Sequence, residues 1–213
     1  MTHRLVIAGS SEHARVVAEA AAAAGWELVG WVGPGPAPDG PMTGLRWMGE
    51  DHGLAERLAT EPGGERTLVV LGFGGPVTRR RSVAELLGRS VSWATVIHPT
   101  AWVAPSARLG PGTVVLARAV VNTGATVGAQ AIVNSGAIVE HDVVLGDFAH
   151  VAPGATIGGG ARIGEDVFVG LNATVRDHVR VGHRVVVGMG AAVVADLPDD
   201  VTVTGVPAMP VDA

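Results

Sequence analysis

The sequence has no cysteine among its 213 residues. Disulfide bonds, cysteine-ligated zinc and a thiol nucleophile are therefore excluded, and the composition suits a reducing compartment. The net charge of −5 gives no basic footprint for nucleic acid. One cluster, "TRRRS" at residues 78–82, is locally basic, and we expect it to form a solvated helix face rather than a phosphate site.

Long apolar segments are also missing. The opening "MTHRLVIAGSSEHAR" turns polar after a short apolar run and does not resemble a signal peptide. Residues 119–139 carry no charge, but Asn, Thr, Gln, Ser and Gly recur too often for a membrane span. We therefore expect a cytoplasmic protein without membrane insertion.

A repeat of six residues dominates the second half of the sequence. From Ile97 to Val193 every sixth position is Ile, Leu or Val, seventeen times in succession. The fourth residue after each of them is Ala, Val or Thr, until Leu197 breaks the pattern. This period fits neither a helix nor an alternating strand, and it indicates a hexapeptide-repeat solenoid. Three repeats per coil would place about 18 residues in each coil and give about five to six coils.

Residues 1–95 alternate between short apolar segments and helical patterns. Strands are predicted at 4–9, 26–32, 67–74 and 91–97, and helices at 10–25, 50–60 and 77–88. The first helix has Ser at its cap and Gly25 at its end. This alternation predicts a small parallel α/β sheet, so we place a domain boundary between residues 95 and 96.

Four motifs carry a resemblance to a known family. They are "VIAGSSEHARVV" near the start, "IHPTAWVAPSA" at 97–107, "VNSGAIVEHDVVLGDFAHVAPGA" at 133–155 and "GVPA" at 205–208. In order and spacing they resemble bacterial sugar acetyltransferases, which include UDP-4-amino-sugar N-acetyltransferases and proteins named sialic-acid O-acetyltransferases. The resemblance implies a Rossmann-like sugar-nucleotide-binding domain in residues 1–95 and a left-handed parallel β-helix in residues 96–213.

The "EHD" segment supplies the candidate catalytic residues. Acetyl transfer needs a base for the acceptor's proton and donors for the developing oxyanion, and a histidine pKa of roughly 6.5 suits the base. The resemblance implies that His141 is this base, that Asp142 orients its ring and that Glu140 binds substrate. Because neighbours on a flat strand point to opposite faces, His141 and Asp142 can meet only at a bent corner.

Two polar residues flank that segment. The resemblance implies that Asn134 helps to place the acetyl group or the acceptor, and that His150 contacts substrate or coenzyme. Because His150 follows His141 by nine residues, or one and a half repeats, the two should not stack within one subunit. They can share a site across a subunit boundary, in agreement with the family's trimeric active sites. The alternatives are an internal polar ladder for Asn134 and plain surface positions for both histidines.

The coil length yields one more candidate. One coil beyond His141 lies Gly159, where a backbone without a side chain lets a thioester approach and an N–H can bind its carbonyl oxygen. By resemblance, the coenzyme A channel between neighbouring β-helices would be lined by Gly170, Asn172, Gly188 and Gly205.

The N-terminal loop "GSSEH" is not a dinucleotide fingerprint, yet a glycine turn before a helix N-terminus favours phosphate. The resemblance implies that Gly9, Ser10 and His13 face the nucleotide-sugar. The chain departs from the family at Glu12, where glycine is usual and a carboxylate would repel phosphate. It also departs at Gly33-Pro34, near where acidic residues often contact the base.

These features predict a homotrimeric, acetyl-CoA-dependent N-acetyltransferase without a metal. In the predicted reaction, His141 deprotonates the 4-amino group of a nucleotide-linked deoxysugar as it attacks the thioester directly. O-acetylation of sialic acid or a related glycan sugar stays open. Two further alternatives are a zinc hydratase and a non-catalytic sugar-nucleotide-binding solenoid. His178 and His183 match the spacing of two zinc ligands, but the third position, two coils earlier, is Asp142.

Overall fold

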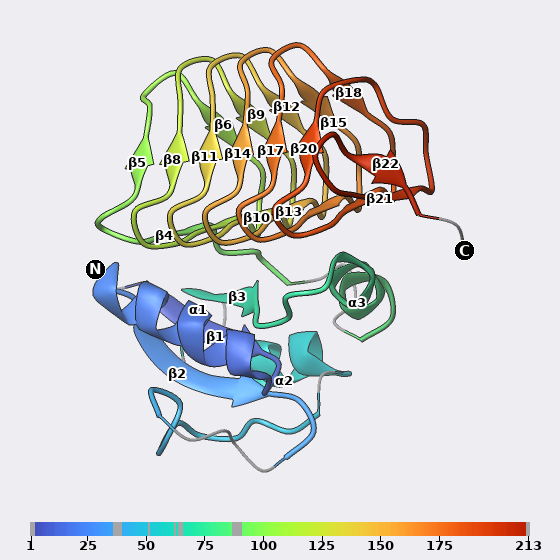
Figure 1. Ribbon diagram of the computed structural model, residues 1–213. Coiled ribbons are helices and arrows are strands. Elements are labelled where there is room, and N and C mark those ends of the chain that lie inside the picture. The colour runs from blue at the N-terminus through green and yellow to red at the C-terminus, as the bar shows by residue number, and fades with distance from the viewer. Residues whose placement is uncertain are drawn as a thin grey trace. The chain divides into compact units, whose positions relative to one another are not determined.

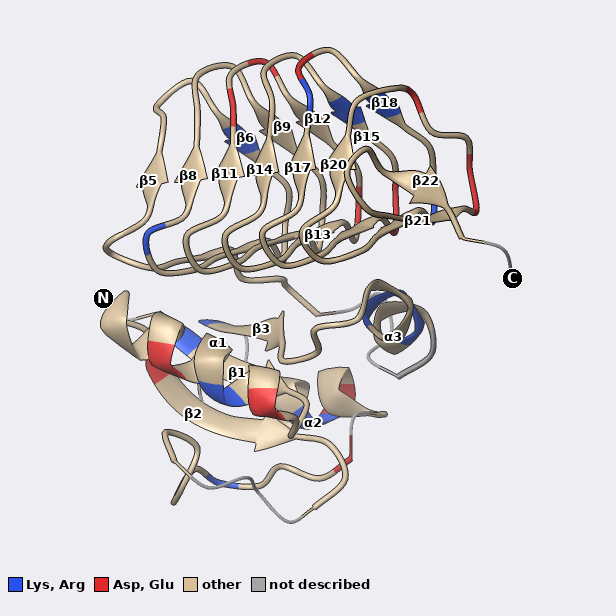
Figure 2. Ribbon diagram, in the orientation of Figure 1, with Lys and Arg blue, Asp and Glu red and all other residues tan. Residues whose placement is uncertain are grey.

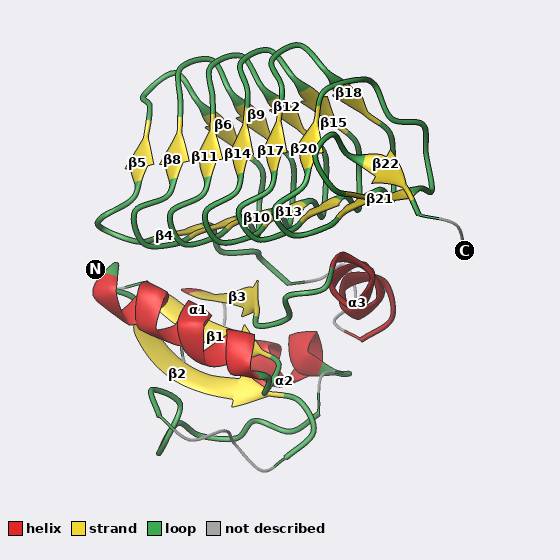
Figure 3. Cartoon of the chain, viewed as in Figure 1, coloured by secondary structure: helices red, strands yellow, loops and turns green. Residues whose placement is uncertain are grey.

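Figure 1 shows the computed structural model, which describes residues 3–35, 40–50, 52–61, 63, 66–86 and 91–211. The chain divides into two compact units, Met1–Pro99 and Thr100–Ala213. Among the described residues, helices occur only in the first unit, while the second consists of short strands joined by turns (Figure 3). No helix in this described part of the chain is long and apolar enough to cross a membrane.

The first unit is an α/β fold, as the alternating pattern predicts. Its three parallel strands are arranged in the order β2-β1-β3. They are β1 (Arg4–Ala8), β2 (Glu27–Val32) and β3 (Thr67–Leu71), and the short strand β4 (Val96–Ile97) does not belong to this sheet. The helices are α1 (Glu12–Ala23), α2 (Leu54–Thr60) and α3 (Pro76–Arg81), followed by a π-helical turn (Ser82–Leu86). Buried aliphatic side chains of the sheet and α2 form the core.

Three local expectations change in this unit. Of the last predicted strand, at 91–97, an isolated bridge between Trp93 and Val69 of β3 and the two-residue strand β4 remain. Ser11 occupies the N-cap of α1, but its hydroxyl donates to the Gly72 carbonyl at 2.7 Å instead of capping the helix. The expectation of a fully solvated basic cluster is wrong for Arg79, which is 1% exposed. Its guanidinium donates to the Gly74 carbonyl, which gives this buried cation a polar partner.

The second unit is the predicted solenoid, whose three faces are parallel sheets (Figure 1). The first face contains β7 (Val114–Val115), β10 (Ile132–Val133), β13 (His150–Val151), β16 (Phe168–Val169), β19 (Val186–Val187) and β21 (Thr202–Thr204), with β22 (Met209–Pro210) antiparallel to β21. The second contains β5 (Trp102–Val103), β8 (Val120–Val121), β11 (Ile138–Val139), β14 (Thr156–Ile157), β17 (Thr174–Val175) and β20 (Ala192–Val193). The third contains β6 (Arg108–Leu109), β9 (Thr126–Val127), β12 (Val144–Leu145), β15 (Arg162–Ile163) and β18 (Arg180–Val181).

The register of these strands confirms a coil of three hexapeptides. Val133 pairs with Val115 on one side and with Val151 on the other, so partners lie 18 residues apart. From Val115 to Val193 the repeated Ile, Leu and Val residues point inward and are almost fully buried, as are the Ala or Val residues four positions later, from Ala119 to Ala191. Each coil therefore stacks its apolar side chains on those of its neighbours, and the period of six follows from the three-sided section.

Most corners of the solenoid use a left-handed backbone residue. From Gly112 to Gly190, each sixth residue has a positive φ, whether it is glycine or not. Because a left-handed residue turns the chain sharply, the two side chains beside it no longer point to opposite faces as they would on a flat strand. Asp142 is one of these corner residues, with a φ of 59°. The corner required for contact between His141 and Asp142 is therefore present.

Candidate active site

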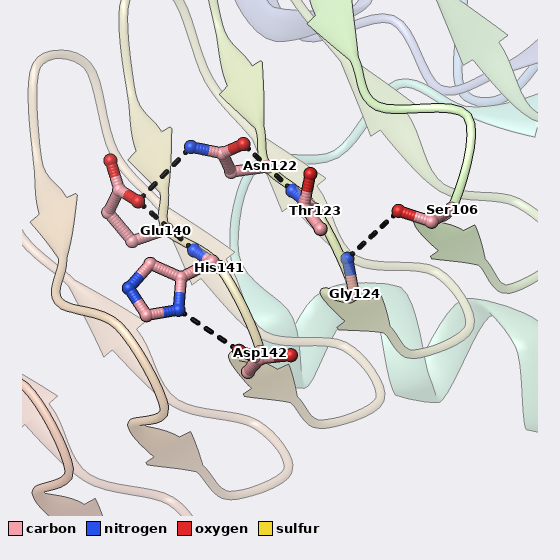
Figure 4. Close-up of polar contacts among 7 residues, drawn as sticks. All are labelled: Ser106, Asn122, Thr123, Gly124, Glu140, His141 and Asp142. Carbon is pink, nitrogen blue, oxygen red and sulfur yellow. Dashed lines mark hydrogen bonds and ion pairs between the residues drawn. The ribbon is translucent and has the colours of Figure 1, made fainter.

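His141 and Asp142 form a hydrogen-bonded pair at the corner that follows β11. The Nδ1 atom of His141 lies 3.0 Å from Oδ2 of Asp142 (Figure 4). The hydrogen bond to Asp142 raises the pKa of His141 above its ordinary value; partial burial opposes this shift, and the negative charges of Asp142 and Glu140 add to it. In the neutral ring, a proton on Nδ1 held by Asp142 leaves the lone pair on Nε2, so the pair presents a base.

The Nε2 atom of His141 faces the next coil at a glycine. A Cβ added at Gly159 would lie 2.5 Å from His141 Nε2, so only a residue without a side chain fits beneath the ring. The register that the sequence predicts for Gly159 is therefore present. This places a backbone segment directly beside the nitrogen that can accept a proton.

The residue before Gly159 offers no side-chain acceptor for the Gly159 N–H. At the equivalent corners of the two preceding coils, the side chain one residue earlier accepts this N–H: Asn122 Oδ1 accepts from Thr123 at 2.8 Å, and Glu140 Oε2 accepts from His141 at 3.1 Å. Gly158 has no side chain, and among the described residues the Gly159 N–H has no acceptor. An unused donor beside a base is the arrangement that an oxyanion requires.

Asn134 and His150 form a second polar pair, separate from the first. Asn134 Nδ2 lies 3.0 Å from His150 Nε2, and both residues are buried. Asn134 Oδ1 accepts the Ser135 N–H at 2.8 Å, which fixes the amide so that its NH₂ faces the imidazole. His150 lies on β13, and Asn134 precedes β11, whereas His141 follows β11. Within one chain the structure therefore keeps His150 away from His141, as the spacing predicts.

Of the residues expected at the coenzyme channel, Gly170, Asn172 and Gly188 lie at successive corners between the first and second faces, and Gly205 lies in the turn that follows β21. Gly170 and Gly188 are packed closely: an added Cβ would lie 2.7 Å from Met189 N and 2.6 Å from Thr204 Cγ2, respectively. Asn172 is an exposed left-handed corner residue, and Gly205 has a φ of 90° between β21 and β22. Close packing explains two of these glycines without coenzyme A, so their contact with it stays a prediction.

The N-terminal loop residues lie at the carboxyl ends of the three parallel strands of the first unit. Gly9 follows β1, has a φ of 121° and donates its N–H to Val32 O at 2.8 Å. Ser10 Oγ donates to the Pro34 carbonyl at 3.1 Å, and His13 lies in the first turn of α1. The carboxyl edge of a parallel sheet is where α/β folds bind ligands. Part of the adjoining loop, residues 36–39, lies outside the described residues.

His13 should make the stability of the protein sensitive to acid. Burial, with a contribution from the positive charge of Arg79, lowers the pKa of His13 from 6.5 to about 4. The unfolded chain then binds more protons than the folded chain between these values, so stability falls as the pH drops through that window. We expect a loss of about 2 kcal/mol between about pH 7 and about pH 5.

Urea denaturation at these two pH values measures this loss. The matched variant His13→Asn should retain more of its stability at the lower pH, because its side chain does not titrate. An identical pH dependence in both proteins would show that His13 is not the group responsible.

The zinc alternative finds no geometric basis in this site. The described residues contain no group of three or more His, Asp or Glu side chains arranged to hold a metal ion. His183 Nδ1 instead accepts the Glu165 N–H at 3.1 Å, so this nitrogen is used within the solenoid.

Comparisons with known proteins give similarity over nearly the whole chain. Residues 4–86 match the family described as the PglD N-terminal domain. The acetyltransferase domain of PglB from Neisseria gonorrhoeae is 35% identical, with 99% of this chain and 100% of that chain covered and a TM-score of 0.86. Perosamine N-acetyltransferase from Caulobacter crescentus is 33% identical, with 98% and 97% covered and a TM-score of 0.90. A comparison with curated proteins finds no match.

The protein combines a hexapeptide solenoid with a histidine oriented by a carboxylate and a backbone N–H that has no acceptor among the described residues. These features place it in the class of hexapeptide-repeat acyltransferases. Within that class, the chain belongs to the sugar acetyltransferases that join a PglD-type N-terminal domain to a left-handed β-helix. The predicted fold class, including its hand, and the predicted acetyltransferase class are thereby confirmed.

Proposed function

We propose that the protein transfers the acetyl group of acetyl-CoA to the amino group of a nucleotide-linked 4-amino-deoxysugar. The observation that carries this proposal is the His141–Asp142 pair, whose open nitrogen faces Gly159. The ligands of the relatives support it: the PglB domain was solved with acetyl coenzyme A, and a variant of the Caulobacter crescentus enzyme with one histidine replaced by asparagine was solved with CoA and GDP-perosamine.

In the proposed mechanism, the acetyl group passes directly from the thioester of acetyl-CoA to the amine of the sugar. The sugar's amino nitrogen attacks the thioester carbonyl carbon, and His141 Nε2 takes a proton from that nitrogen as the new C–N bond forms. Asp142 holds the opposite ring nitrogen and stabilises the imidazolium. The Gly159 N–H donates to the carbonyl oxygen while it carries negative charge. The C–S bond then breaks, and the departing CoA thiolate takes the proton from the His141 imidazolium, which returns the base to its neutral form without a covalent intermediate on the enzyme.

The first unit would hold the nucleotide of the acceptor. Its carboxyl strand edge presents Gly9, Ser10 and the first turn of α1, and His13 is neutral at physiological pH because its pKa is lowered to about 4. A neutral imidazole can donate to or accept from a ligand without adding charge. This favours a role for His13 in hydrogen bonding to the nucleotide-sugar rather than in neutralising phosphate.

We also propose a homotrimer. Asn134, which is paired with His150, lies before β11 and the His141–Asp142 pair lies after it, so the two pairs are at opposite ends of this strand. The strands of the second face, which separates these ends, carry no charged residue, whereas β6, β15 and β18 of the third face carry arginine (Figure 2). Trp102 on the second face is 58% exposed. A second copy docked there would bring the partner subunit's His141 toward Asn134 and His150. Sedimentation that gives a monomer would overturn this arrangement.

The proposed reaction is tested by thiol release from acetyl-CoA, with mass detection of the product. The acceptor panel contains UDP-, dTDP- and GDP-linked amino sugars, including GDP-perosamine, with the free amino sugars and sialic acid as comparisons. Acetylation of a nucleotide-linked amine is the expected result. Acetylation of sialic acid alone would replace the proposal with O-acetyl transfer, and no turnover of any acceptor would favour a binding role.

Asp142→Asn should lower turnover and move its pH dependence. Asparagine also tolerates the left-handed backbone at this corner, so the change removes the charge and keeps the shape of the side chain. Because Asp142 raises the pKa of His141, its loss should shift the acidic limb of the kcat/KM profile to lower pH. We expect kcat at neutral pH to fall about tenfold or more, since the amide carries no charge to stabilise the imidazolium and its NH₂ group can hold the ring in the wrong tautomer. A pH–rate profile measures both effects, and an unchanged profile would remove Asp142 from the mechanism.

A further inference from the structure

Asn122 lies one coil before Glu140 and is hydrogen-bonded to it. Asn122 Nδ2 donates to Glu140 Oε2 at 3.1 Å, and the same carboxylate oxygen accepts the His141 N–H at 3.1 Å (Figure 4). Asn122 is itself fixed, because its Oδ1 accepts the Thr123 N–H at 2.8 Å. With the oxygen occupied in this way, the Asn122 NH₂ group can face only toward Glu140.

The second oxygen of Glu140 is not used by the protein. Among the described residues, Oε1 of Glu140 has no hydrogen-bond partner, and Figure 4 shows it directed away from both Asn122 and His141. Glu140 is half-buried, and two donors hold one of its oxygens in place. The direction in which the other oxygen can accept a further hydrogen bond is therefore fixed. Glu140 immediately precedes His141, so that donor would stand beside the base.

We propose that Asn122 is a positioning residue for acetyl transfer, which fixes the Glu140 carboxylate so that its free oxygen binds the amino group of the acceptor next to His141. This inference rests on the proposed function, because it assumes an amine acceptor. An amine or ammonium group offers N–H donors to a carboxylate, and the charge-assisted bond is among the stronger hydrogen bonds in proteins. Asn122 then acts on the acceptor through Glu140 without touching it.

Two substitutions separate this role from a structural one. Asn122→Asp keeps an oxygen that accepts the Thr123 N–H. It replaces the NH₂ group that faces Glu140 with a second carboxylate oxygen. The two negative charges then repel each other and displace Glu140. Asn122→Ala removes both contacts. The matched control is Ser106→Ala, one coil before Gly124, which removes the hydrogen bond that Ser106 Oγ accepts from the Gly124 N–H at 3.2 Å and leaves Glu140 untouched.

Steady-state kinetics with GDP-perosamine, or with whichever acceptor of the panel turns over, provides the first test. We expect both Asn122 variants to raise the KM of the acceptor about tenfold or more, with the KM of acetyl-CoA unchanged, because a charge-assisted contact to the acceptor is lost. Asn122→Asp should melt near the wild-type temperature, and Ser106→Ala should keep wild-type kinetics. Wild-type kinetics in both Asn122 variants would overturn the proposal, as would equal losses in Ser106→Ala.

An NMR titration of the His141 ring gives a second test that needs no turnover. Asp142 and Glu140 are the charged groups that raise the pKa of His141. Asn122→Ala leaves Asp142 in place, so a lower His141 pKa in this variant would show that Asn122 holds Glu140 beside the ring. An unchanged pKa would overturn the positioning role. If the wild type acetylates no acceptor and the pKa still falls, the proposed function fails while the positioning of Glu140 by Asn122 stands.

Discussion

Replacing His141 by alanine should lower kcat for acetyl transfer by about 10²- to 10⁴-fold, which is the usual contribution of a positioned general base. The imidazole is 57% exposed in the structure, so its removal leaves the apolar core of the solenoid intact. Binding of acetyl-CoA should stay near the wild-type value, because the proposed role is to move a proton rather than to hold the coenzyme. Thiol release under saturating acetyl-CoA measures the first quantity, and calorimetry measures the second.

A matched control distinguishes loss of the base from loss of any surface histidine. His183 lies on the same solenoid and accepts the Glu165 N–H at 3.1 Å, so His183→Ala removes a structural contact outside the proposed chemistry. We expect this variant to keep its activity. Wild-type turnover in His141→Ala would mean that another group, or water, takes the proton. A strong loss in His183→Ala together with bound zinc would restore the metal alternative.

The fold could be predicted from sequence because the hexapeptide pattern reports one physical constraint repeated many times. Each inward position, such as Val133 and its partners at 115 and 151, must fill the same space in every coil, so the aliphatic residue recurs every six positions. The α/β unit offers fewer such constraints. Its last predicted strand pairs with β3 only through an isolated bridge at Trp93, although residues 91–97 are as rich in β-formers as the other strands.

The candidate site could be predicted only in part, because the coil length predicts register but not side-chain contacts. Adding one coil to His141 identifies Gly159, and the structure places the ring there. The same arithmetic, applied one coil backward from Glu140, identifies Asn122, but its pairing with Glu140 depends on rotamers that the period does not specify. The burial of Arg79 could not be predicted from the sequence either, because three consecutive arginines are typical of a solvated helix face.

The open N–H of Gly159 shows how a missing side chain contributes to a site. Asn122 and Glu140 each cap the N–H that follows them, and Gly158 cannot. A pair of glycines at this corner therefore has two separate effects. Gly158 leaves a donor unused, and Gly159 makes room for the imidazole above it.

Gly159→Ala should reduce kcat about 100-fold or more by displacing the base. No positive φ is required at Gly159, so alanine can adopt the backbone and keep the N–H. The new Cβ would lie 2.5 Å from Nε2 and 2.7 Å from Cε1 of His141, so the ring must rotate and give up its 3.0 Å contact with Asp142. A displacement of about 1 Å is enough for a loss of this size. The melting temperature should change little, because the atoms in the way belong to an exposed side chain.

A double-mutant cycle with His141→Ala shows whether the effect passes through the ring. The three atoms nearest to the added Cβ all belong to His141, so in the His141→Ala background the methyl group has space. Gly159→Ala should then cause no further loss of kcat, and the two substitutions should be strongly non-additive. If Gly159→Ala costs as much in the absence of His141 as in its presence, the methyl group obstructs the thioester itself. In that case the glycine would serve the acetyl donor, and the base would not depend on it.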